Sequence, residues 1–266
     1  MVQVPFTLAH AAAAWPLRRT RLILSALVVG TFAPDFEYYL RLVPGGQFGH
    51  TLSGVFILDL PLSLVVLWLF HTYMREPIVT LLPDPIQRRI SQRPRTFRFW
   101  GPARLALVIG SILAGVATHI VWDWFTHPTF WVYHHWAVLS QTVRLPIVGT
   151  VQYYMLFQHG STVVGCAFVL TWLLHWYRAT TPDEGISVRT YSPAMKHGLL
   201  AFLTVLTLSA ALVRAFVGVG TPHSPRMAEK FLVDVVVTIM TLVWLQLLAY
   251  GIVWTRQQRA RQQVEA

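Results

Sequence analysis

Residues 105–127 read LALVIGSILAGVATHIVWDWFTH, and this stretch decides the fold class. Between Leu105 and Phe125 the only charged side chain is that of Asp123. A helix that crosses a membrane needs about 20 mostly apolar residues, and few other structures tolerate so long an apolar run. The stretch is therefore predicted to be a transmembrane helix, and it carries His119 and Asp123 within its outer part.

Runs of similar length occur along the rest of the chain. They are Leu22–Leu42, Leu52–Met74, Val151–Tyr177, Gly198–Val219 and Phe231–Trp254. Composition agrees, because 55% of residues are hydrophobic and only 12% are charged, about half the usual share for a soluble domain. The sequence predicts an all-α membrane bundle of about six transmembrane helices, forming one integral-membrane domain over residues 1–266.

The basic residues give an orientation. With the N-terminus in the cytoplasm, 16 of the 21 Lys and Arg residues fall on the cytoplasmic side, as the positive-inside rule requires. We therefore expect a multi-pass protein of the cell membrane with both termini inside. The Arg-rich segment 75–104 is predicted to be a cytoplasmic loop near anionic lipid. The net charge of +10 could indicate a nucleic-acid-binding protein, but the sequence lacks the aromatic-plus-basic pattern typical of that class. Membrane lipid is therefore the expected partner of the basic residues.

The N-terminal segment and the single cysteine limit the possible chemistry. Residues 5–17, PFTLAHAAAAWPL, are too short to span a membrane. They are predicted to form a short helix that either lies in the interface or half-inserts with His10. Cys166 is the only cysteine, which excludes an internal disulfide framework and a cysteine-based zinc site.

Ionisable residues collect at one depth of the predicted spans. At about 1.5 Å of rise per residue, Asp35, Asp59, His119 and His159 each lie roughly 21–28 Å from the cytoplasmic end of their span. His50 and His127 fall in the adjoining outer loops. An ionised group at the membrane centre costs roughly 2.5–3.5 kcal/mol on insertion scales, and a bound cation would remove most of that cost for a carboxylate.

The strongest local pattern is His119-x-x-x-Asp123-x-x-x-His127. Positions four and eight residues apart share one helix face, so an imidazole and a carboxylate can hold the same divalent metal ion, with zinc the expected one. The alternative is a His–Asp hydrogen bond that only satisfies two polar groups at a helix end. Pro128 follows and predicts that the helix ends near His127.

Four further residues are candidates for the same site. Asp35 is a candidate ligand, or a cap where Pro34 breaks its helix, and His50 follows a Gly-rich loop that can bring it to the site. Asp59 is a candidate general base or a residue that stabilises the bend at Pro61. Glu37 is the other candidate base, although it faces away from Asp35 if the helix continues.

Several short motifs together resemble an uncharacterised bacterial domain-of-unknown-function family. The motifs are PFTxxHA (residues 5–11), APDFEY (33–38), HTLxG (50–54), DLP (59–61) and HxxxDxxxH (119–127). That family is similar to inner-membrane proteins labelled as predicted metal-dependent hydrolases. The motif order also resembles the helical zinc phospholipase C and single-strand nuclease families.

The resemblance implies a ligand set and a reaction. The implied metal ligands are His10, Asp35, His50, His119, Asp123 and His127, with an activated water that attacks a phosphodiester. Those zinc enzymes have a later His-x-x-x-Glu motif. Here the residue four positions after His159 is Val163 instead of a glutamate. One or two ions are therefore expected rather than three.

The resulting hypothesis is a membrane-embedded metal-dependent hydrolase. Its substrate would be a lipid or lipid-linked (phospho)ester at the outer leaflet. Two alternatives remain open at this point, a non-catalytic scaffold with a structural His–Asp network and a transporter or proton pathway. The oligomeric state is not predicted.

Overall fold

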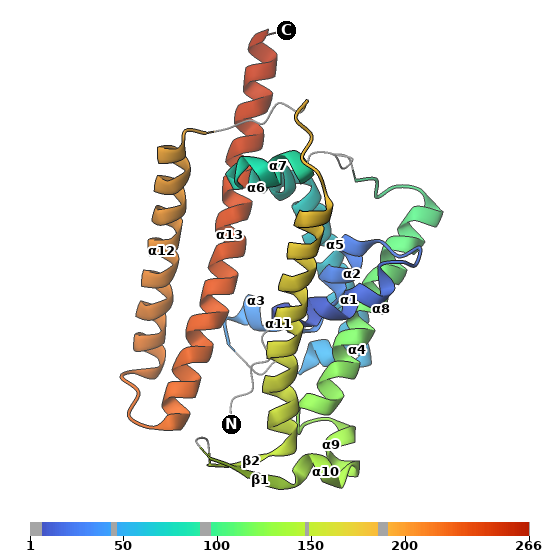
Figure 1. The fold of residues 1–266 in the computed structure, drawn as a ribbon, viewed down its shortest axis with the longest axis vertical. Helices are drawn as coiled ribbons and strands as arrows, with labels where there is room; N and C mark the ends of the chain where they lie inside the picture. Colours follow the sequence, from blue (N-terminus) through green and yellow to red (C-terminus); the bar gives the residue numbers. More distant parts are fainter. Residues whose placement is uncertain (1–6, 44–46, 91–96, 147–148, 186–190, 266) are drawn as a thin grey trace.

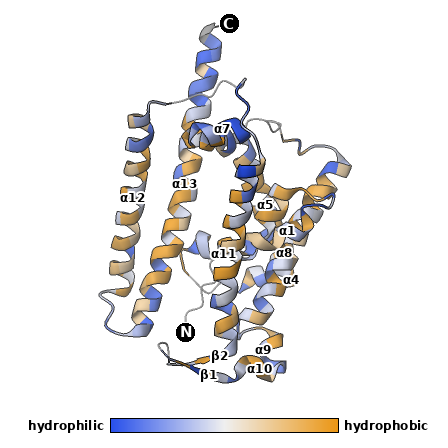
Figure 2. Ribbon diagram, in the orientation of Figure 1, coloured by the Kyte–Doolittle hydropathy of each residue, from blue (hydrophilic) through white to orange (hydrophobic). Residues whose placement is uncertain are grey.

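The computed structural model describes residues 7–43, 47–90, 97–146, 149–185 and 191–265 (Figure 1). Within these ranges, five helical stretches are long and apolar enough to cross a membrane. They are Leu52–Leu81, Pro102–His135, Tyr153–Ala179, Pro193–Val219 and Pro225–Gln263. Figure 2 shows hydrophobic residues along these helices and hydrophilic residues on the C-terminal end of the chain. The predicted class, a helical membrane bundle, is confirmed.

The first predicted span, Leu22–Leu42, is not one continuous helix. It is divided into α2 (Leu24–Gly30), the 3₁₀ turn η2 (Ala33–Asp35) and α3 (Phe36–Arg41). Pro34 explains the break, because its ring clashes with the preceding turn and it has no amide hydrogen to donate. The break turns Asp35 into the bundle, where it is fully buried.

The N-terminal segment is inserted into the bundle. It forms the 3₁₀ helix η1 (Thr7–Ala13) and the short α1 (Ala14–Leu17), and η1 packs against the helices α8 and α11 that are described below. Gly165 of α11 allows this approach, because a Cβ there would lie 2.9 Å from the carbonyl oxygen of Ala9. Burial of His10 to 1% exposure excludes a helix that lies flat on the surface. Residues 5 and 6 of the motif lie outside the described residues.

The second span is longer than predicted and contains two π-helical turns. Its parts are α4 (Leu52–Gly54), η4 (Val55–Asp59), α5 (Leu60–Leu69), η5 (Phe70–Met74) and α6 (Arg75–Leu81). The first of the two π turns ends at Asp59, and such turns occur frequently at functional sites because they redirect side chains.

The Arg-rich segment continues with α7 (Asp84–Ile90), which lies close to α6 at one end of the bundle (Figure 1). Arg88 donates to the carbonyl oxygens of Asp183 and Glu184, and Arg89 donates to those of Tyr177 and Thr180. These arginines therefore hold the connection that follows the fourth predicted span. Residues 91–96 of the predicted loop lie outside the described part of the chain.

The third and fourth predicted spans are α8 (Pro102–Thr126) and α11 (Tyr153–Ala179). Between them lie α9 (Trp131–His135), α10 (Ala137–Ser140) and a small hairpin. In the hairpin, β1 (Thr142–Leu145) pairs antiparallel with β2 (Gly149–Gln152), with Val143 opposite Val151. This hairpin is the one departure from the predicted all-α class among the described residues.

The last two spans form a helical hairpin, α12 (Pro193–Val219) and α13 (Pro225–Glu265). Arg214 of α12 lies 3.5 Å from the carboxylate of Asp234 of α13 and also donates to the backbone carbonyl of Leu42. Leu42 follows α3 in a left-handed conformation, with a φ of 52°. The hairpin is thereby connected to the end of α3.

The core that positions the site lies between α2 and α8. Ala26, Ile112 and Val116 are buried in it, and two glycines allow the helices to approach closely. Gly30 packs against the backbone of Ile112, and Gly115 packs against the backbone of Leu27 and Thr31. Small residues at a contact are a common means of close helix packing in membranes. The contact places the carbonyl group of Thr31 beside His119.

Candidate metal centre

The six ligands that the resemblance implies come together in the structure. His10 lies on η1, Asp35 on η2, His50 on η3 (Phe48–His50), His119 and Asp123 on α8, and His127 directly after α8. Two sets of three residues could each hold a metal ion, because within each set the potential ligand atoms all lie within 4.8 Å of one another. One set is His10, His119 and Asp123, and the other is Asp35, His50 and His119.

Asp123 is at the middle of the cluster. One of its carboxylate oxygens, Oδ2, lies 3.2 Å from Nε2 of His50 and 3.2 Å from Nε2 of His119. The other, Oδ1, lies 3.6 Å from Nε2 of His10 and 3.5 Å from Nδ1 of His127. Each oxygen therefore faces two imidazoles from different parts of the chain, an arrangement in which one carboxylate can serve two adjacent cation positions.

The tautomer of His119 follows from its backbone partner. Nδ1 of His119 lies 2.8 Å from the carbonyl oxygen of Thr31, and a carbonyl oxygen only accepts hydrogen bonds, so Nδ1 carries the proton. In the neutral ring the lone pair is then on Nε2, which faces Asp123 and lies 3.7 Å from Oδ1 of Asp35. A histidine that donates its other N–H to a backbone carbonyl is the usual arrangement of a metal ligand.

Asp35 is oriented by two residues that the sequence analysis did not identify as part of the site. The hydroxyl of Thr7 donates to Oδ2 of Asp35 at 2.5 Å, and the hydroxyl of Tyr39 donates to Thr7 at 2.7 Å. This leaves Oδ1 directed at His119 and at His50, whose Nε2 is 4.0 Å away. Thr7 belongs to the PFTxxHA motif, which was the available signal for its role.

Four atoms of the cluster are buried without a hydrogen-bond partner. They are Nδ1 of His10, Oδ1 of Asp35, Nε2 of His119 and Oδ1 of Asp123. A buried polar group without a partner costs about 1–3 kcal/mol, and a charged one costs more. Because imidazole nitrogens and carboxylate oxygens are ligand atoms for zinc-like ions, the residues present fit a divalent cation.

Packing of its loop holds His50 in place. A Cβ at Gly49 would lie 2.5 Å from the carbonyl oxygen of Pro34 and 3.0 Å from Oδ1 of Asp59, so a glycine is needed at this close approach. Glu37 accepts a hydrogen bond from the amide of Phe48 at 3.0 Å and pairs with Arg41 at 2.6 Å. Its carboxylate is thus engaged in fixing the loop.

Two residues considered from the sequence lie outside the cluster. The carboxylate of Asp59 is fully buried, belongs to neither ligand set and has no hydrogen-bond partner on either oxygen. His159 is exposed on α11. The structure therefore does not bring His159 to the other histidines.

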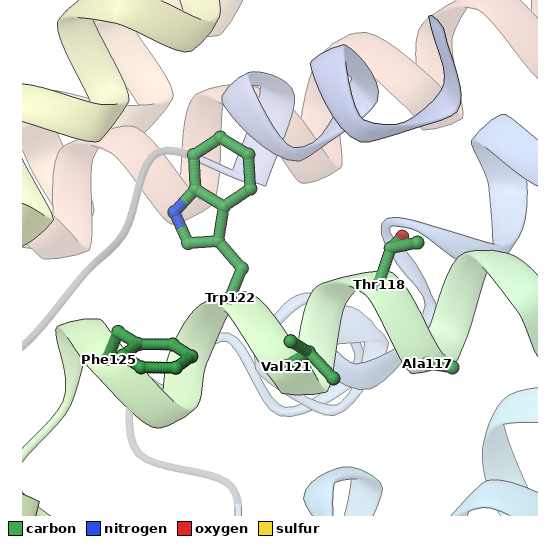
Figure 3. Close-up of a pocket in the computed structure, with 5 residues that line it drawn as sticks. All are labelled: Ala117, Thr118, Val121, Trp122 and Phe125. Atoms are coloured by element: carbon green, nitrogen blue, oxygen red, sulfur yellow. The ribbon is translucent and has the colours of Figure 1, made fainter. Parts of the chain in front are cut away.

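An apolar groove of about 360 Å³ lies on α8 near the cluster (Figure 3). Its lining consists of Ala117, Thr118, Val121, Trp122 and Phe125. Trp122 separates the groove from the cluster, because its ring lies 5.2 Å from that of His10 and its indole N–H donates to Ser161 of α11. The cluster thus lies beside a surface suited to hydrocarbon.

A family model matches residues 4–252, nearly the whole chain. The chain belongs to the family described as Domain of unknown function (DUF4184). No curated protein and no solved structure gives a significant match. The predicted membership of an uncharacterised family is confirmed, and in this DUF4184 chain the matched region includes every residue of the cluster.

Proposed function

We propose that the protein is a membrane-embedded, metal-dependent hydrolase that acts on a lipid or lipid-linked (phospho)ester. The observation that carries the proposal is the convergence of four imidazoles and two carboxylates with four buried, partnerless ligand atoms. Asp35, His50, His119 and Asp123 would hold one divalent ion, with zinc the expected metal. His10 and His127, on the other oxygen of Asp123, would complete or extend the site.

A bound divalent cation supplies two things to such a reaction: it lowers the pKa of a coordinated water toward about 7 and it polarises a phosphoryl or acyl oxygen. The protein supplies the geometry. The carbonyl of Thr31 fixes the tautomer of His119, and Thr7 fixes one oxygen of Asp35 so that the other remains available. Such outer partners commonly determine affinity as much as the ligands do.

The location of the cluster supports a lipid substrate. His119 and Asp123 lie on a helix that is apolar enough to cross a membrane, and the apolar groove of the same helix begins beside Trp122. A lipid ester already lies at the interface depth. Hydrocarbon matches this groove, because the polar atoms of its lining residues Thr118 and Trp122 already have hydrogen-bond partners. A water-soluble substrate would gain nothing from this surface.

A purely structural His–Asp network is less compatible with the contacts. Buried polar networks in proteins normally satisfy their members, and a network kept only for packing is expected to pair its buried atoms. Here four buried atoms from four residues have no hydrogen-bond partner. A cation held between Asp35 and His119 would supply a partner for two of them, Oδ1 of Asp35 and Nε2 of His119.

The proposal is tested by the metal content of the purified protein. We expect a stoichiometric amount of zinc or a similar divalent ion by inductively coupled plasma mass spectrometry, and its loss in His119→Ala and Asp123→Asn. His159→Ala is the matched control, because this histidine is exposed on α11 and should leave the metal content unchanged. A metal-free wild-type protein, or variants that keep the full metal content, would contradict the proposal.

Hydrolysis is tested separately with defined probes. Metal-loaded protein in mixed micelles is supplied with a fluorescent phospholipid and with the soluble diester bis(p-nitrophenyl) phosphate. We expect release of a phosphoester product from the lipid probe, abolished in Asp123→Asn. If the metal-loaded protein cleaves neither probe and no carboxylic ester lipid, the proposed metal centre stands but the proposed hydrolase activity is contradicted.

A further inference from the structure

Asp59 and Ser63 form a second set of partnerless polar atoms, separate from the metal centre. Both residues are fully buried, and neither carboxylate oxygen of Asp59 nor the hydroxyl oxygen of Ser63 has a hydrogen-bond partner. They lie four residues apart at the junction of η4 and α5, so they share one face of the same span. A buried polar group without a partner calls for an unseen water or ion.

The local backbone around Asp59 has two features that are common at binding sites. Asp59 ends a π-helical turn, a feature frequent at functional sites. Its Oδ1 and the carbonyl oxygen of Pro34 both lie close to Gly49, near the break between α2 and α3. In membrane proteins, interrupted helices of this kind supply backbone carbonyls and carboxylates to bound cations.

The charges identify the kind of ion. Asp35, Asp59 and Asp123 are three buried carboxylates, and a divalent ion in the metal centre compensates the charges of Asp35 and Asp123 only. The ionisable side chains with the largest electrostatic effect on Asp59 are His50, His119, Asp35 and Glu37, and none of them is a lysine or an arginine. When Asp59 is ionised, a bound cation would compensate its buried charge, which is otherwise costly.

We propose that Asp59 and Ser63 bind a monovalent cation of the sodium type, in an oxygen-lined site next to the metal centre. Oxygen donors favour hard cations, whereas the imidazole-rich centre favours zinc-like ions, so the two sites select different metals. The site gives Asp59 a role other than general base. It requires no hydrolytic activity and no atom of the six-residue cluster as a ligand, but its charge argument rests on the divalent ion of the proposed metal centre.

The test is the response of thermal stability to sodium with the divalent ion removed. Protein in detergent with EDTA is unfolded in NaCl and in N-methyl-D-glucamine chloride at equal ionic strength. A ligand that binds only the folded state raises its stability in a saturable way. We expect sodium to raise the Tm by about 3 °C or more, and Asp59→Asn and Ser63→Ala to lose this response. In sodium-free medium Asp59→Asn should be at least as stable as the wild type, because it has no charge to bury.

Ser111→Ala is the matched control. Ser111 is an equally buried serine on α8, but its hydroxyl accepts from the amide of Ile23 and donates to the carbonyl of Leu107. This variant should lower the Tm and keep the full sodium response.

If Asp59→Asn does not fold, Ser63→Ala tests the proposal alone. We then expect this variant to raise the half-saturating sodium concentration at least tenfold. A wild-type protein without a specific sodium response, or one whose response survives both substitutions, overturns the proposal and leaves Asp59 as a proton acceptor. Metal analysis of the same preparations before EDTA is added separates that outcome from failure of the zinc site.

Discussion

At the scale of single residues, the candidate ligands are oriented by hydrogen-bond partners that are not themselves ligands. His119 has one ring nitrogen committed to the carbonyl of Thr31, and Asp35 has one oxygen committed to Thr7. Each residue is left with one atom directed at the others. The hydroxyl chain from Tyr39 through Thr7 to Asp35 joins the N-terminal segment to the residue after the helix break.

Thr7→Val tests whether the hydroxyl of Thr7 orients Asp35. The valine keeps the shape of the side chain but leaves the hydroxyl of Tyr39 and Oδ2 of Asp35 without their partner. We expect divalent-ion affinity to fall about 10–100-fold, as is typical for loss of an outer partner, and stability to fall by about 1–3 kcal/mol. Chelator competition measures the affinity. Thr20→Val, which removes a surface hydroxyl bonded only near its own turn, should change neither quantity; equal affinity in the two variants would count against the role of Thr7.

At the scale of elements, the contact between α2 and α8 determines where the ligands lie. Gly115 on α8, four residues before His119, packs against the backbone of Leu27 on α2 and of Thr31, which directly follows α2. The close approach allows the carbonyl of Thr31 to reach His119, and Asp35 follows after the break at Pro34. A small side chain at one contact therefore influences two ligands.

Gly115→Leu should separate these helices. A leucine cannot fit where even a Cβ would lie 2.8 Å from the amide nitrogen of Thr31. We expect reduced yield of monodisperse protein and loss of bound metal, both measured on the same gel-filtration fractions. Gly110→Leu, five residues earlier on the same helix and open to its surroundings, should keep both. Full metal content in Gly115→Leu would show that the contact does not position His119.

The elements also show how far sequence reasoning extends. Hydropathy and the four-residue spacing of His119, Asp123 and His127 are local signals, so the bundle and the ligand face of α8 could be predicted. Pro34 signalled the break after α2, but the run of apolar residues around it still predicted one span. The bond from Thr7 to Asp35 joins residues 28 positions apart and depends on tertiary packing, which no local pattern contains. The same is true of the bond from the amide of Phe48 to Glu37, whereas the pairing of Glu37 with Arg41, four residues on, is a local pattern.

At the scale of the whole molecule, the N-terminal part determines the topology. Five crossings alone would place the two ends of the chain on opposite sides of the membrane. The distribution of basic residues predicts both ends in the cytoplasm. On that prediction, the broken segment from α2 to α3 would complete a sixth crossing. Its polar residues are tolerable at that depth because the break is buried in protein rather than exposed to lipid.

Single-cysteine labelling tests this topology. In a Cys166→Ser background, Thr20→Cys and Ala260→Cys should react with an impermeant maleimide only after the cytoplasmic side is opened. Arg226→Cys, in the first turn of α13, should react from the outside of intact cells. Labelling of Thr20→Cys from outside would mean that the segment from α2 to α3 does not cross, and that the N-terminal region faces outward.

The chemical make-up of the cluster has a consequence for the conditions it can endure. Its six residues offer only nitrogen and oxygen, and the one sulfhydryl of the chain, in Cys166, stands on α11. Thiolate ligands are oxidised stepwise to sulfenic and sulfinic acids, most readily where they are accessible to solvent. Imidazole and carboxylate groups have no comparable series of oxidation products. A centre built in this way would tolerate peroxide and thiol-blocking reagents, and would offer no soft donor to cuprous ions.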